Sequence, residues 1–402
     1  MMRKAPRSVR PHVAILGKVN VGKSTLINAL ADQEVALVSD EPGTTTDPVY
    51  KSMELLPFGP VVLVDTAGLD DESVLGRRRG EMTGRVLRKS DAAVLLVEGE
   101  EPDSRERGVI EELKRRDVVY IVVRNVRGTL PETAEGILAV NALSREGVDR
   151  LKEALANLLE THHRERPLVS DLLCDEGIVL LVTPIDSSAP KGRLILPQVQ
   201  VLRDILDGGY SAAVCRDTEL SETLQALGNL PQLVITDSRV FGEVARVLPP
   251  GSPLTSFSIL MARHKGEIDE LIRGASAVEA LEPGDSVLVS ESCTHHRQKN
   301  DIGTVIIPRI LRDRAGGDLQ FTHTAGSDLP RDLEQFDLIV HCGGCMMTRK
   351  EMMSRLDQVV ASGVPVVNYG ILLAHAQGNL PRAIEPLRAR VEKVAGSSCD
   401  PS

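Results

Sequence analysis

Short apolar runs alternate with amphipathic stretches along almost the whole chain. Apolar runs of this length are typical of buried β-strands, and the stretches between them have the spacing of helices with one apolar face. Strands that alternate with helices form parallel sheets covered on both faces, so the pattern predicts an α/β fold. The runs expected to form strands are residues 13–16, 61–64, 92–97, 118–123, 138–140, 178–182, 212–215, 233–236, 255–259, 287–290, 319–324, 338–340 and 364–367.

Breaks in this alternation divide the chain into three expected domains. A polar stretch at 161–167 interrupts the pattern, and the strand expected at 255–259 completes a second, small sheet. We therefore expect domains at residues 1–166, 167–262 and 263–402. A chain of 402 residues fits about two to three domains. No internal repeat is evident in the sequence.

Composition and charge narrow the class of protein. Lys and Arg number 47 and Asp and Glu number 57, so the net charge is −10, and the chain has five Phe, four Tyr and no Trp. An acidic chain with few aromatic side chains is a poor nucleic-acid binder. No apolar run approaches the roughly 20 residues of a membrane span, and the first is too short for a signal peptide. We therefore expect a cytoplasmic protein that binds neither nucleic acid nor membrane, with its cysteines as thiols.

A phosphate-binding loop follows the first expected strand. The segment Gly17-Lys18-Val19-Asn20-Val21-Gly22-Lys23-Ser24 lies between an apolar strand and a helix, which is the context that such loops require. Its glycines let backbone N–H groups converge on phosphate oxygens, Lys23 faces the β- and γ-phosphates, and the Ser24 hydroxyl reaches Mg²⁺. The candidate nucleotide-binding residues here are Gly17, Asn20, Val21, Gly22, Lys23, Ser24 and Thr25.

Two further motifs make this interpretation more specific. Asp65-Thr66-Ala67-Gly68 ends an expected strand, where its aspartate can hold the Mg²⁺ shell and its glycine N–H can contact the γ-phosphate. Gly43-Thr44-Thr45-Thr46-Asp47 lies where a first switch loop is expected, and we assign Thr45 to Mg²⁺. Over residues 10–165 these motifs resemble the small GTPases of the TrmE–Era group. The resemblance implies a Ras-like P-loop domain that binds GTP with Mg²⁺.

The catalytic features predict slow hydrolysis. The residue after Gly68 is Leu69, which cannot orient a water molecule as the glutamine of Ras-like enzymes does. In potassium-activated members of the TrmE–Era group, an asparagine of the phosphate loop helps to bind K⁺, and the resemblance implies this role for Asn20. A structural role of Asn20 within the loop is the alternative. The candidate catalytic residues are Lys23, Thr45, Asp65 and, on family analogy as a water-positioning group, Asp71.

The base-reading motif departs from the usual one. GTPases read guanine with Asn-Lys-x-Asp, whose carboxylate accepts hydrogen bonds from the guanine ring. The matching segment here is Arg124-Asn125-Val126-Arg127, with Arg127 at the carboxylate position unless the register slips by one to Asn125. The expected base contacts are Asn125 and, from a weak match to the motif that closes over the base, Asn141 and Ala142. This departure predicts weaker guanine selectivity without loss of triphosphate binding.

Cysteine and histidine residues cluster after two of the later strands. One group follows the strand expected at 287–290, and the other follows the strand at 338–340. If these strands are neighbours, both groups lie at the carboxyl edge of the sheet, where open α/β sheets bind ligands. Three cysteines with a histidine suit zinc, whereas three cysteines with an open position suit a 4Fe–4S cluster, and the residues alone leave both open. The candidate metal ligands are Cys293, His295, His341, Cys342 and Cys345.

The combination of motifs resembles the HydF family of FeFe-hydrogenase maturation GTPases, and the resemblance covers essentially the whole chain. It rests on the GTPase motifs, on Cys-x-His followed by His-Cys-x-x-Cys, and on residues 184–186 and 189–197. It implies a GTP-binding domain, a dimerisation domain and a domain that binds a 4Fe–4S cluster. The implied ligands are Cys293, Cys342 and Cys345, with His295 and His341 beside them.

The resemblance also implies partners. It suggests a homodimeric scaffold whose cluster helps to hold a diiron H-cluster precursor. Radical-SAM hydrogenase maturases would assemble this precursor, and apo FeFe-hydrogenase would receive it. One alternative is a zinc-binding GTPase of tRNA or ribosome metabolism, against which the acidic charge counts. A binding module that has lost turnover is the other.

Overall fold

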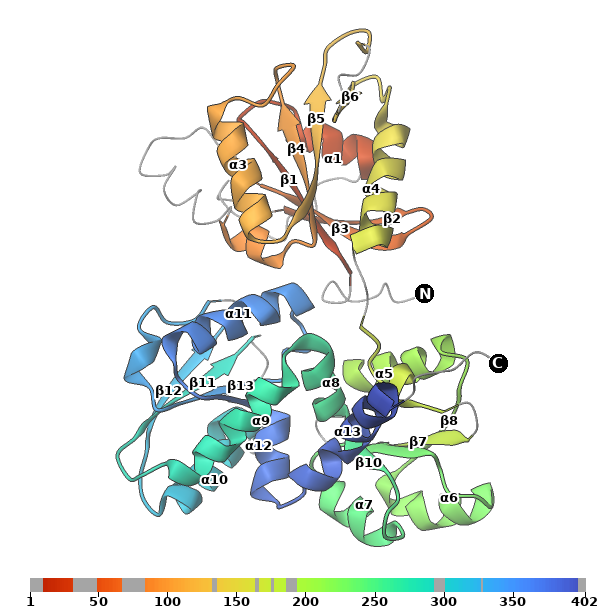
Figure 1. Ribbon diagram of the computed structural model, residues 1–402, viewed down its shortest axis with the longest axis vertical. Helices are drawn as coiled ribbons and strands as arrows, with labels where there is room; N and C mark the ends of the chain where they lie inside the picture. Colours follow the sequence, from red (N-terminus) through yellow and green to blue (C-terminus); the bar gives the residue numbers. More distant parts are fainter. Residues whose placement is uncertain are drawn as a thin grey trace. The chain divides into compact units, whose positions relative to one another are not determined.

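The computed structural model describes residues 10–31, 49–66, 84–131, 136–162, 166–174, 177–185, 194–292, 301–326 and 328–396, with side chains to residue 388. It divides into two compact units, Met1–Glu165 and Arg166–Ser402, each with its own sheets (Figure 1). Among the described helices, none is both long and apolar enough to cross a membrane.

The N-terminal unit is a six-stranded sheet with helices on both faces. The strand order is β2-β3-β1-β4-β5-β6, and only the edge strand β2 runs antiparallel to its neighbour. The first helix and the last pack on one face, while α3 packs on the other. The elements are β1 (His12–Gly17), α1 (Lys23–Ala31), β2 (Val49–Leu55), β3 (Gly59–Asp65), β4 (Ala92–Val97), α3 (Ser104–Arg115), β5 (Val119–Asn125), β6 (Ile137–Val140) and α4 (Val148–His162).

The C-terminal unit contains two four-stranded parallel sheets, ordered β10-β9-β7-β8 and β12-β11-β13-β14. The first is built from β7 (Ile178–Val182), α5 (Leu196–Asp207), β8 (Ser211–Cys215), α6 (Leu220–Leu227), β9 (Leu233–Thr236), α7 (Phe241–Val247), β10 (Leu254–Ser256) and α8 (Phe257–Lys265). The second follows with α9 (Ile268–Ala277), β11 (Ser286–Glu291), α10 (Ile307–Ala315), β12 (Gln320–Ala325), β13 (Leu338–His341), α11 (Arg349–Ser362), β14 (Val366–Asn368), α12 (Tyr369–Ala376) and α13 (Leu380–Gly396). The α/β fold expected from the sequence, with its Ras-like P-loop unit and smaller parallel sheets, is confirmed.

The two C-terminal sheets are copies of one topology, although no repeat is evident when the sequence is read alone. In each sheet the first strand along the chain lies between the second and the third, and the fourth is at an edge. Each copy ends in a strand, a capping side chain and a helix: Ser256 accepts a hydrogen bond from the Ile259 N–H, and Asn368 accepts one from the Ile371 N–H. Residues 253–268 and 365–380 align without gaps at these elements. Most of the aligned positions differ between the copies, so the repeat is not evident from the sequence alone.

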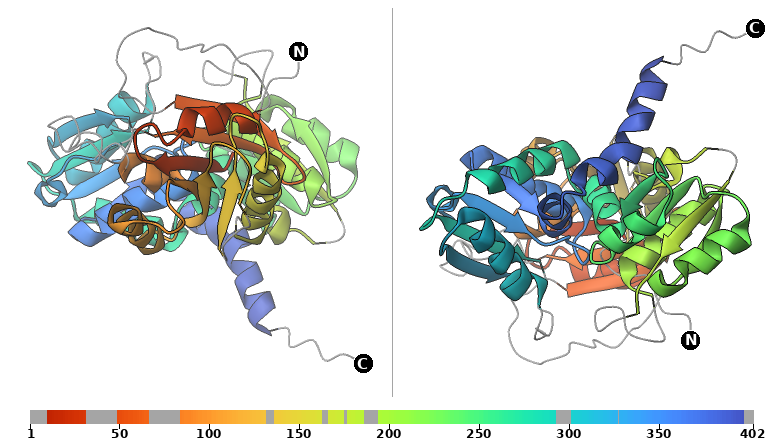
Figure 2. Two further views of the ribbon diagram at one scale, coloured as in Figure 1. Left: turned by 90° about the horizontal axis from the view of Figure 1, so that it is seen from above. Right: turned by 90° about the horizontal axis from the view of Figure 1, so that it is seen from below.

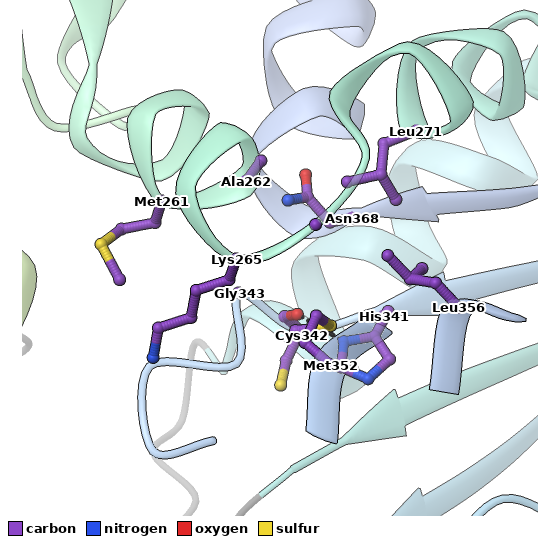
Figure 3. Close-up of a pocket in the computed structure, with 11 residues that line it drawn as sticks. Met261, Ala262, Lys265, Leu271, His341, Cys342, Gly343, Met352, Leu356 and Asn368 are labelled. Atoms are coloured by element: carbon purple, nitrogen blue, oxygen red, sulfur yellow. Dashed lines mark hydrogen bonds between the residues drawn. The ribbon is translucent and has the colours of Figure 1, made fainter. Parts of the chain in front are cut away.

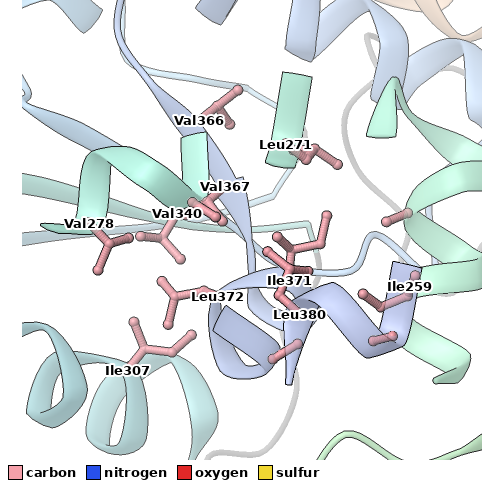
Figure 4. Close-up of a cluster of buried hydrophobic side chains, with 14 of the residues drawn as sticks. Ile259, Leu271, Val278, Ile307, Val340, Val366, Val367, Ile371, Leu372 and Leu380 are labelled. Atoms are coloured by element: carbon pink, nitrogen blue, oxygen red, sulfur yellow. The ribbon is translucent and has the colours of Figure 1, made fainter. Parts of the chain in front are cut away.

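The two copies exchange helices. Helix α9, which follows the first copy, packs against β14, and helix α13, which follows the second copy, packs against β10. Helices α8, α12 and α13 lie between the two sheets (Figures 1 and 2). At the equivalent positions 258 and 370 the copies nearly touch, because a Cβ added to Gly370 would lie 2.4 Å from the Ser258 Cβ. One buried apolar cluster therefore runs through both copies (Figure 4).

One expected strand differs from this arrangement. The strand expected at 255–259 is shorter, since β10 ends at Ser256, whose hydroxyl caps α8 instead. The boundary expected near residue 262 falls inside α8, and Thr255 Oγ1 donates across the two copies to the Ala383 carbonyl at 2.8 Å. The edge strand β2 went unanticipated because only its last residue, Leu55, is buried, so it has no apolar run.

Candidate functional sites

The phosphate loop connects β1 to α1 through backbone conformations that its glycines permit. Gly17 and Gly22 have φ of 147° and 96°, and Asn20 has φ of 62°. A Cβ at Gly22 would lie 2.3 Å from Asn125 Nδ2, and one at Gly17 would lie 2.9 Å from the Leu96 carbonyl oxygen. Glycine is therefore required at both positions, as a loop that wraps closely around phosphate demands.

Lys23 begins helix α1 and turns its ammonium back over the loop. The side chain is 8% exposed, and its Nζ donates to the carbonyl oxygens of Gly17 at 3.0 Å and Lys18 at 2.7 Å. A cation beside a helix N-terminus, at the centre of a glycine-rich loop, creates a positive field that suits phosphate oxygens.

The two expected magnesium ligands of the described part converge from different elements. Ser24 Oγ donates to Asp65 Oδ2 at 2.8 Å, because β1 and β3 are parallel neighbours with Ile15 opposite Asp65. Burial raises the pKa of Asp65 above its usual value, against the opposing effects of Ser24 and the Lys23 charge. A bound divalent cation would favour the ionised carboxylate. The other expected residues of this site, Thr45, Gly68, Leu69 and Asp71, lie outside the described residues.

Asn125, the last residue of β5, joins the phosphate loop to the loop after β6. Its Nδ2 donates to the Val21 carbonyl at 2.9 Å, and its Oδ1 accepts from the Ala142 N–H at 3.2 Å. The Asn125 side chain faces the phosphate loop, whereas the Arg124 guanidinium lies 3.4 Å from the Glu100 carboxylate. These contacts favour the slipped register, in which the expected base-reading motif starts at Asn125.

This register moves the missing carboxylate from Arg127 to Gly128, three residues after Asn125. Gly128 has φ of +121°, and a Cβ added there would meet no atom within 4 Å. Its carbonyl oxygen accepts from Asn141 Nδ2 at 3.0 Å. Asn141 Oδ1 in turn accepts from two backbone N–H groups and shapes the turn beside Ala142. The expected base residues thus lie together, with open space where a guanine-reading carboxylate would be.

The strands that precede the two cysteine and histidine groups end at one sheet edge, since β11 and β13 are parallel neighbours with Ser290 opposite His341. Ser292, which precedes Cys293, contacts Cys342 directly: its N–H and Oγ lie 3.1 and 2.9 Å from Sγ. Cys293 and His295 themselves lie outside the described residues. Within the described part, no group of three potential metal ligands is close enough to hold an ion.

The environment of Cys342 favours a thiolate. Burial alone would raise the pKa of Cys342, but the His341 imidazole and the two Ser292 hydrogen bonds outweigh it and lower the pKa to about 6. Burial and the neighbouring Cys342 raise the pKa of Cys345. Thiolates are the form of cysteine that binds metal, so the loop contains one preformed ligand and one that a metal would have to deprotonate.

His341 is 2% exposed and lies beside this thiol. Its Nδ1 is 2.6 Å from the Cys342 carbonyl oxygen, and its Nε2 has no hydrogen-bond partner among the described residues. His341 and Cys342 line a small pocket with Lys265, Asn368 and apolar side chains (Figure 3). A buried, unpaired imidazole nitrogen is an unusual feature, and it is compatible with a ligand at this edge.

Two buried cations at this edge are absent from the sequence-based expectations. Lys265 and Arg355 are 3% and 2% exposed, and no carboxylate of the described residues lies within ion-pair distance of either. Arg355 donates to Ser290 Oγ and to the Gly326 carbonyl. Burial lowers the pKa of Lys265 to about 8, against the opposing effects of the two thiols and, more weakly, of the Glu351 carboxylate beyond ion-pair distance. Lys265 ends the basic last turn of α8, and Arg355 lies among the charged residues of α11, so no local signal could have identified either as buried.

These pKa shifts predict ordered alkylation of the metal-free protein. At pH 7 iodoacetamide should modify Cys342 before Cys345. Cys342, with a pKa of about 6, is mainly thiolate at this pH, whereas the raised pKa of Cys345 keeps it mainly protonated. The Cys342 rate should fall as the pH decreases through about 6. Peptide mass spectrometry after timed quenching measures both rates. Equal rates at pH 7 would contradict the thiolate assignment.

Models of known protein families match most of the chain. The hydrogen maturase F dimerization domain matches residues 168–266, and the hydrogen maturase F tetramerization domain matches residues 269–386. Residues 12–170 match the 50S ribosome-binding GTPase family.

The chain belongs to the hydrogen maturase F family. The resemblance to HydF proteins is thereby confirmed, and the N-terminal unit is a GTPase domain. The dimerization and tetramerization domains support oligomer formation. The region expected to bind a cluster coincides with the tetramerization domain.

The N-terminal unit is also similar to curated GTPases. The tRNA modification GTPase MnmE of Parvibaculum lavamentivorans is 34% identical over 168 residues, which cover 41% of this chain and 37% of that protein. GTPase Der of Wolinella succinogenes is 32% identical over 193 residues, covering 41% and 39%. The chain thus spans well under half the length of these relatives. The crystal structure of an Aquifex aeolicus Era variant bound to GDP and AlF4⁻ is 18% identical, covering 59% of this chain and 97% of that chain with a TM-score of 0.32.

Proposed function

We propose that this protein is a GTP-binding iron–sulfur scaffold of FeFe-hydrogenase maturation. In this proposal it assembles or carries the diiron H-cluster precursor, receives it from radical-SAM maturases and delivers it to apo FeFe-hydrogenase. Residues 1–166 bind and hydrolyse GTP, residues 167–262 take part in dimerisation, and residues 263–402 bind a 4Fe–4S cluster. Membership of the hydrogen maturase F family supports the maturation role.

The observation that carries the cluster proposal is the thiolate-favouring edge formed by β11 and β13. Cys342 has a lowered pKa, the loop that follows contains Cys345, and the Ser292 N–H contacts the Cys342 thiol. The proposed ligands are Cys293, Cys342 and Cys345, with His295 and His341 beside them. A 4Fe–4S cluster held by three cysteines supplies an iron with an open position, which suits a role in holding a precursor.

Anaerobic reconstitution with iron and sulfide tests this proposal. The expected result is about four iron and four sulfide per chain, as a 4Fe–4S cluster requires. Zinc at one equivalent without iron would favour the alternative, a zinc-binding GTPase of tRNA or ribosome metabolism. Reconstituted protein that has been loaded with the diiron precursor by the radical-SAM maturases, and then tested for activation of apo FeFe-hydrogenase, would examine the delivery step.

The nucleotide half of the proposal uses Lys23 for the phosphates and Ser24 with Asp65 for Mg²⁺, supported by their convergence on one loop. Thr45 completes the proposed metal shell, and Asp71 is the proposed water-positioning group. Hydrolysis is slow in this proposal because Leu69 replaces a water-orienting glutamine.

Potassium should raise the hydrolysis rate. Asn20 lies in the phosphate loop with a positive φ of 62°. Its position in the loop corresponds to that of the K⁺-binding asparagine of related GTPases. GTP turnover should therefore rise when K⁺ replaces Na⁺ at matched ionic strength, and Asn20→Ala should abolish the difference. Steady-state phosphate release measures it. Equal rates in the two salts would assign Asn20 a structural role only.

Guanine selectivity should be weak. A site built to hydrogen-bond a base edge rejects analogues by leaving buried groups unpaired, and Gly128 leaves no carboxylate to read the guanine amino group. GTP and ITP, which differ only in that amino group, should therefore bind with Kd values within about threefold of each other, against the ten- to hundredfold expected for a charged hydrogen bond. Competition against a fluorescent nucleotide measures both, with ATP as the third ligand. A large GTP preference would show that another residue reads the base.

A further inference from the structure

The ammonium of Lys265 is bound entirely to the loop that contains the Cys-x-x-Cys motif. Its Nζ donates to the carbonyl oxygens of Gly344 at 3.0 Å, Cys345 at 3.1 Å and Met347 at 2.7 Å. A lysine ammonium has three N–H donors, so all of them are used within four consecutive residues. Figure 3 shows the side chain extending from α8 to this loop.

Gly344 shapes the same loop on the side opposite Lys265. Gly344 has φ of +59°, and a Cβ there would lie 2.1 Å from Met352 Cε. Glycine therefore lets the chain turn between Met352 and Lys265. The peptide carbonyls point to the ammonium while the two cysteines flank the turn in sequence.

Lys265 belongs to the first copy of the repeat, whereas the loop belongs to the second. It ends α8, which follows β10, and it lies 79 residues before Gly344. The equivalent position in the second copy is Gln377, by the alignment of residues 253–268 with 365–380. The side chain of Gln377 accepts from Asn379 Nδ2 instead. Of these two equivalent positions, only the one beside the cysteines has a charged residue.

A buried cation without a carboxylate partner is costly unless an anion compensates it. Arg355 adds a second such cation on the same edge. The dipoles of three carbonyls satisfy the hydrogen bonds of Lys265 but do not neutralise its charge. Thiolates, or an anionic metal centre ligated by thiolates, would neutralise this charge.

We propose that Lys265 is a positioning residue for the thiolate centre, and this proposal rests on the cluster site proposed above. Its three hydrogen bonds hold the conformation of the 343–347 loop, which follows Cys342 and contains Cys345. Its charge offsets the negative charge of an anionic iron–sulfur centre. The centre is thus built from both copies, with Lys265 contributed by the region that matches the dimerization domain.

Lys265→Met in the full chain tests this inference, with Gln377→Met at the equivalent helix end as the matched control. In the metal-free protein, Lys265→Met should change the alkylation rates of Cys342 and Cys345, since the loop loses its three bonds. After reconstitution it should bind iron about 10- to 100-fold more weakly, as loss of an outer-shell partner typically does. The electron paramagnetic resonance g-values of the residual reduced cluster should shift, which a merely structural loss of occupancy would not cause. The control should match the unaltered protein in all three measurements.

Unchanged alkylation rates, iron titration and g-values in Lys265→Met would overturn the inference. If the unaltered protein takes up no iron–sulfur cluster, the proposed function fails, but the alkylation rates still decide whether Lys265 holds the loop. If Lys265→Met does not unfold cooperatively on heating, Lys265→Gln, which keeps hydrogen-bond donors without the charge, replaces it. Lys265→Gln should keep the alkylation rates of Cys342 and Cys345 close to those of the unaltered protein but still weaken iron binding. Full iron binding in that variant would show that the charge has no part in the centre.

Discussion

Cys342→Ser should lose most of the iron–sulfur cluster, and Cys293→Ser and Cys345→Ser should do the same. Thiolates bind iron far more strongly than a neighbouring imidazole does, and a serine hydroxyl is a poor substitute at neutral pH. Cys342 has the largest expected effect because His341 and Ser292 already favour its thiolate. Iron and sulfide content, with electron paramagnetic resonance of the reduced protein, measures the loss.

Cys174→Ser is the matched control for this experiment, because Cys174 is an exposed, isolated thiol. His295→Ala and His341→Ala should retain the cluster but change the spectrum of its unique iron. A cysteine variant with a full, unaltered signal, together with a histidine variant that has lost it, would show that the ligand assignment is wrong.

Lys23→Ala should reduce nucleotide affinity by at least about 100-fold, or about 2.7 kcal/mol, because it removes the charged hydrogen bonds to the β- and γ-phosphates. The ammonium is already held over the loop by the Gly17 and Lys18 carbonyls, so the unaltered site is preorganised. Isothermal titration with GTP and Mg²⁺ measures the change. Ser24→Ala should weaken binding only when Mg²⁺ is present.

Lys114→Ala provides the control for the loss of one lysine, since Lys114 lies on the exposed face of α3 and pairs with Glu111. Thermal unfolding of each variant separates loss of affinity from loss of folding. Unchanged GTP affinity in a folded Lys23→Ala protein would refute the phosphate site.

Much of the fold could be predicted from local sequence, because buried parallel strands are continuous apolar runs. The expected strands at 92–97, 178–182 and 233–236 coincide with β4, β7 and β9. The prediction failed where a strand has little buried surface, as in β2, and where a capping hydroxyl ends a strand early, as at Ser256. The first depends on contacts distant in the sequence, whereas the second is a local capping bond from the Ile259 N–H to Ser256 that the apolar pattern does not show.

The placement of the candidate sites was predictable for a related reason. A group that follows a parallel strand lies at the carboxyl edge of the sheet, so Ser292 and Cys342 meet once β11 and β13 are neighbours. The register of the base-reading motif was not predictable, because two readings of residues 124–128 fit the spacing equally. The contacts of Asn125 with Val21 and Ala142 decided it.

The sequence by itself determined most of the strands and helices, the phosphate loop and the cysteine pair, since each is a short pattern whose chemistry is local. Only the tertiary structure decided that the two C-terminal sheets are one exchanged repeat with a common core. It alone brought Lys265 to carbonyl groups about 80 residues away. The physical reason is that a long-range hydrogen bond produces no periodic pattern in the sequence. A lysine at a helix end looks the same in the sequence whether its ammonium binds water or the carbonyl groups of a buried loop.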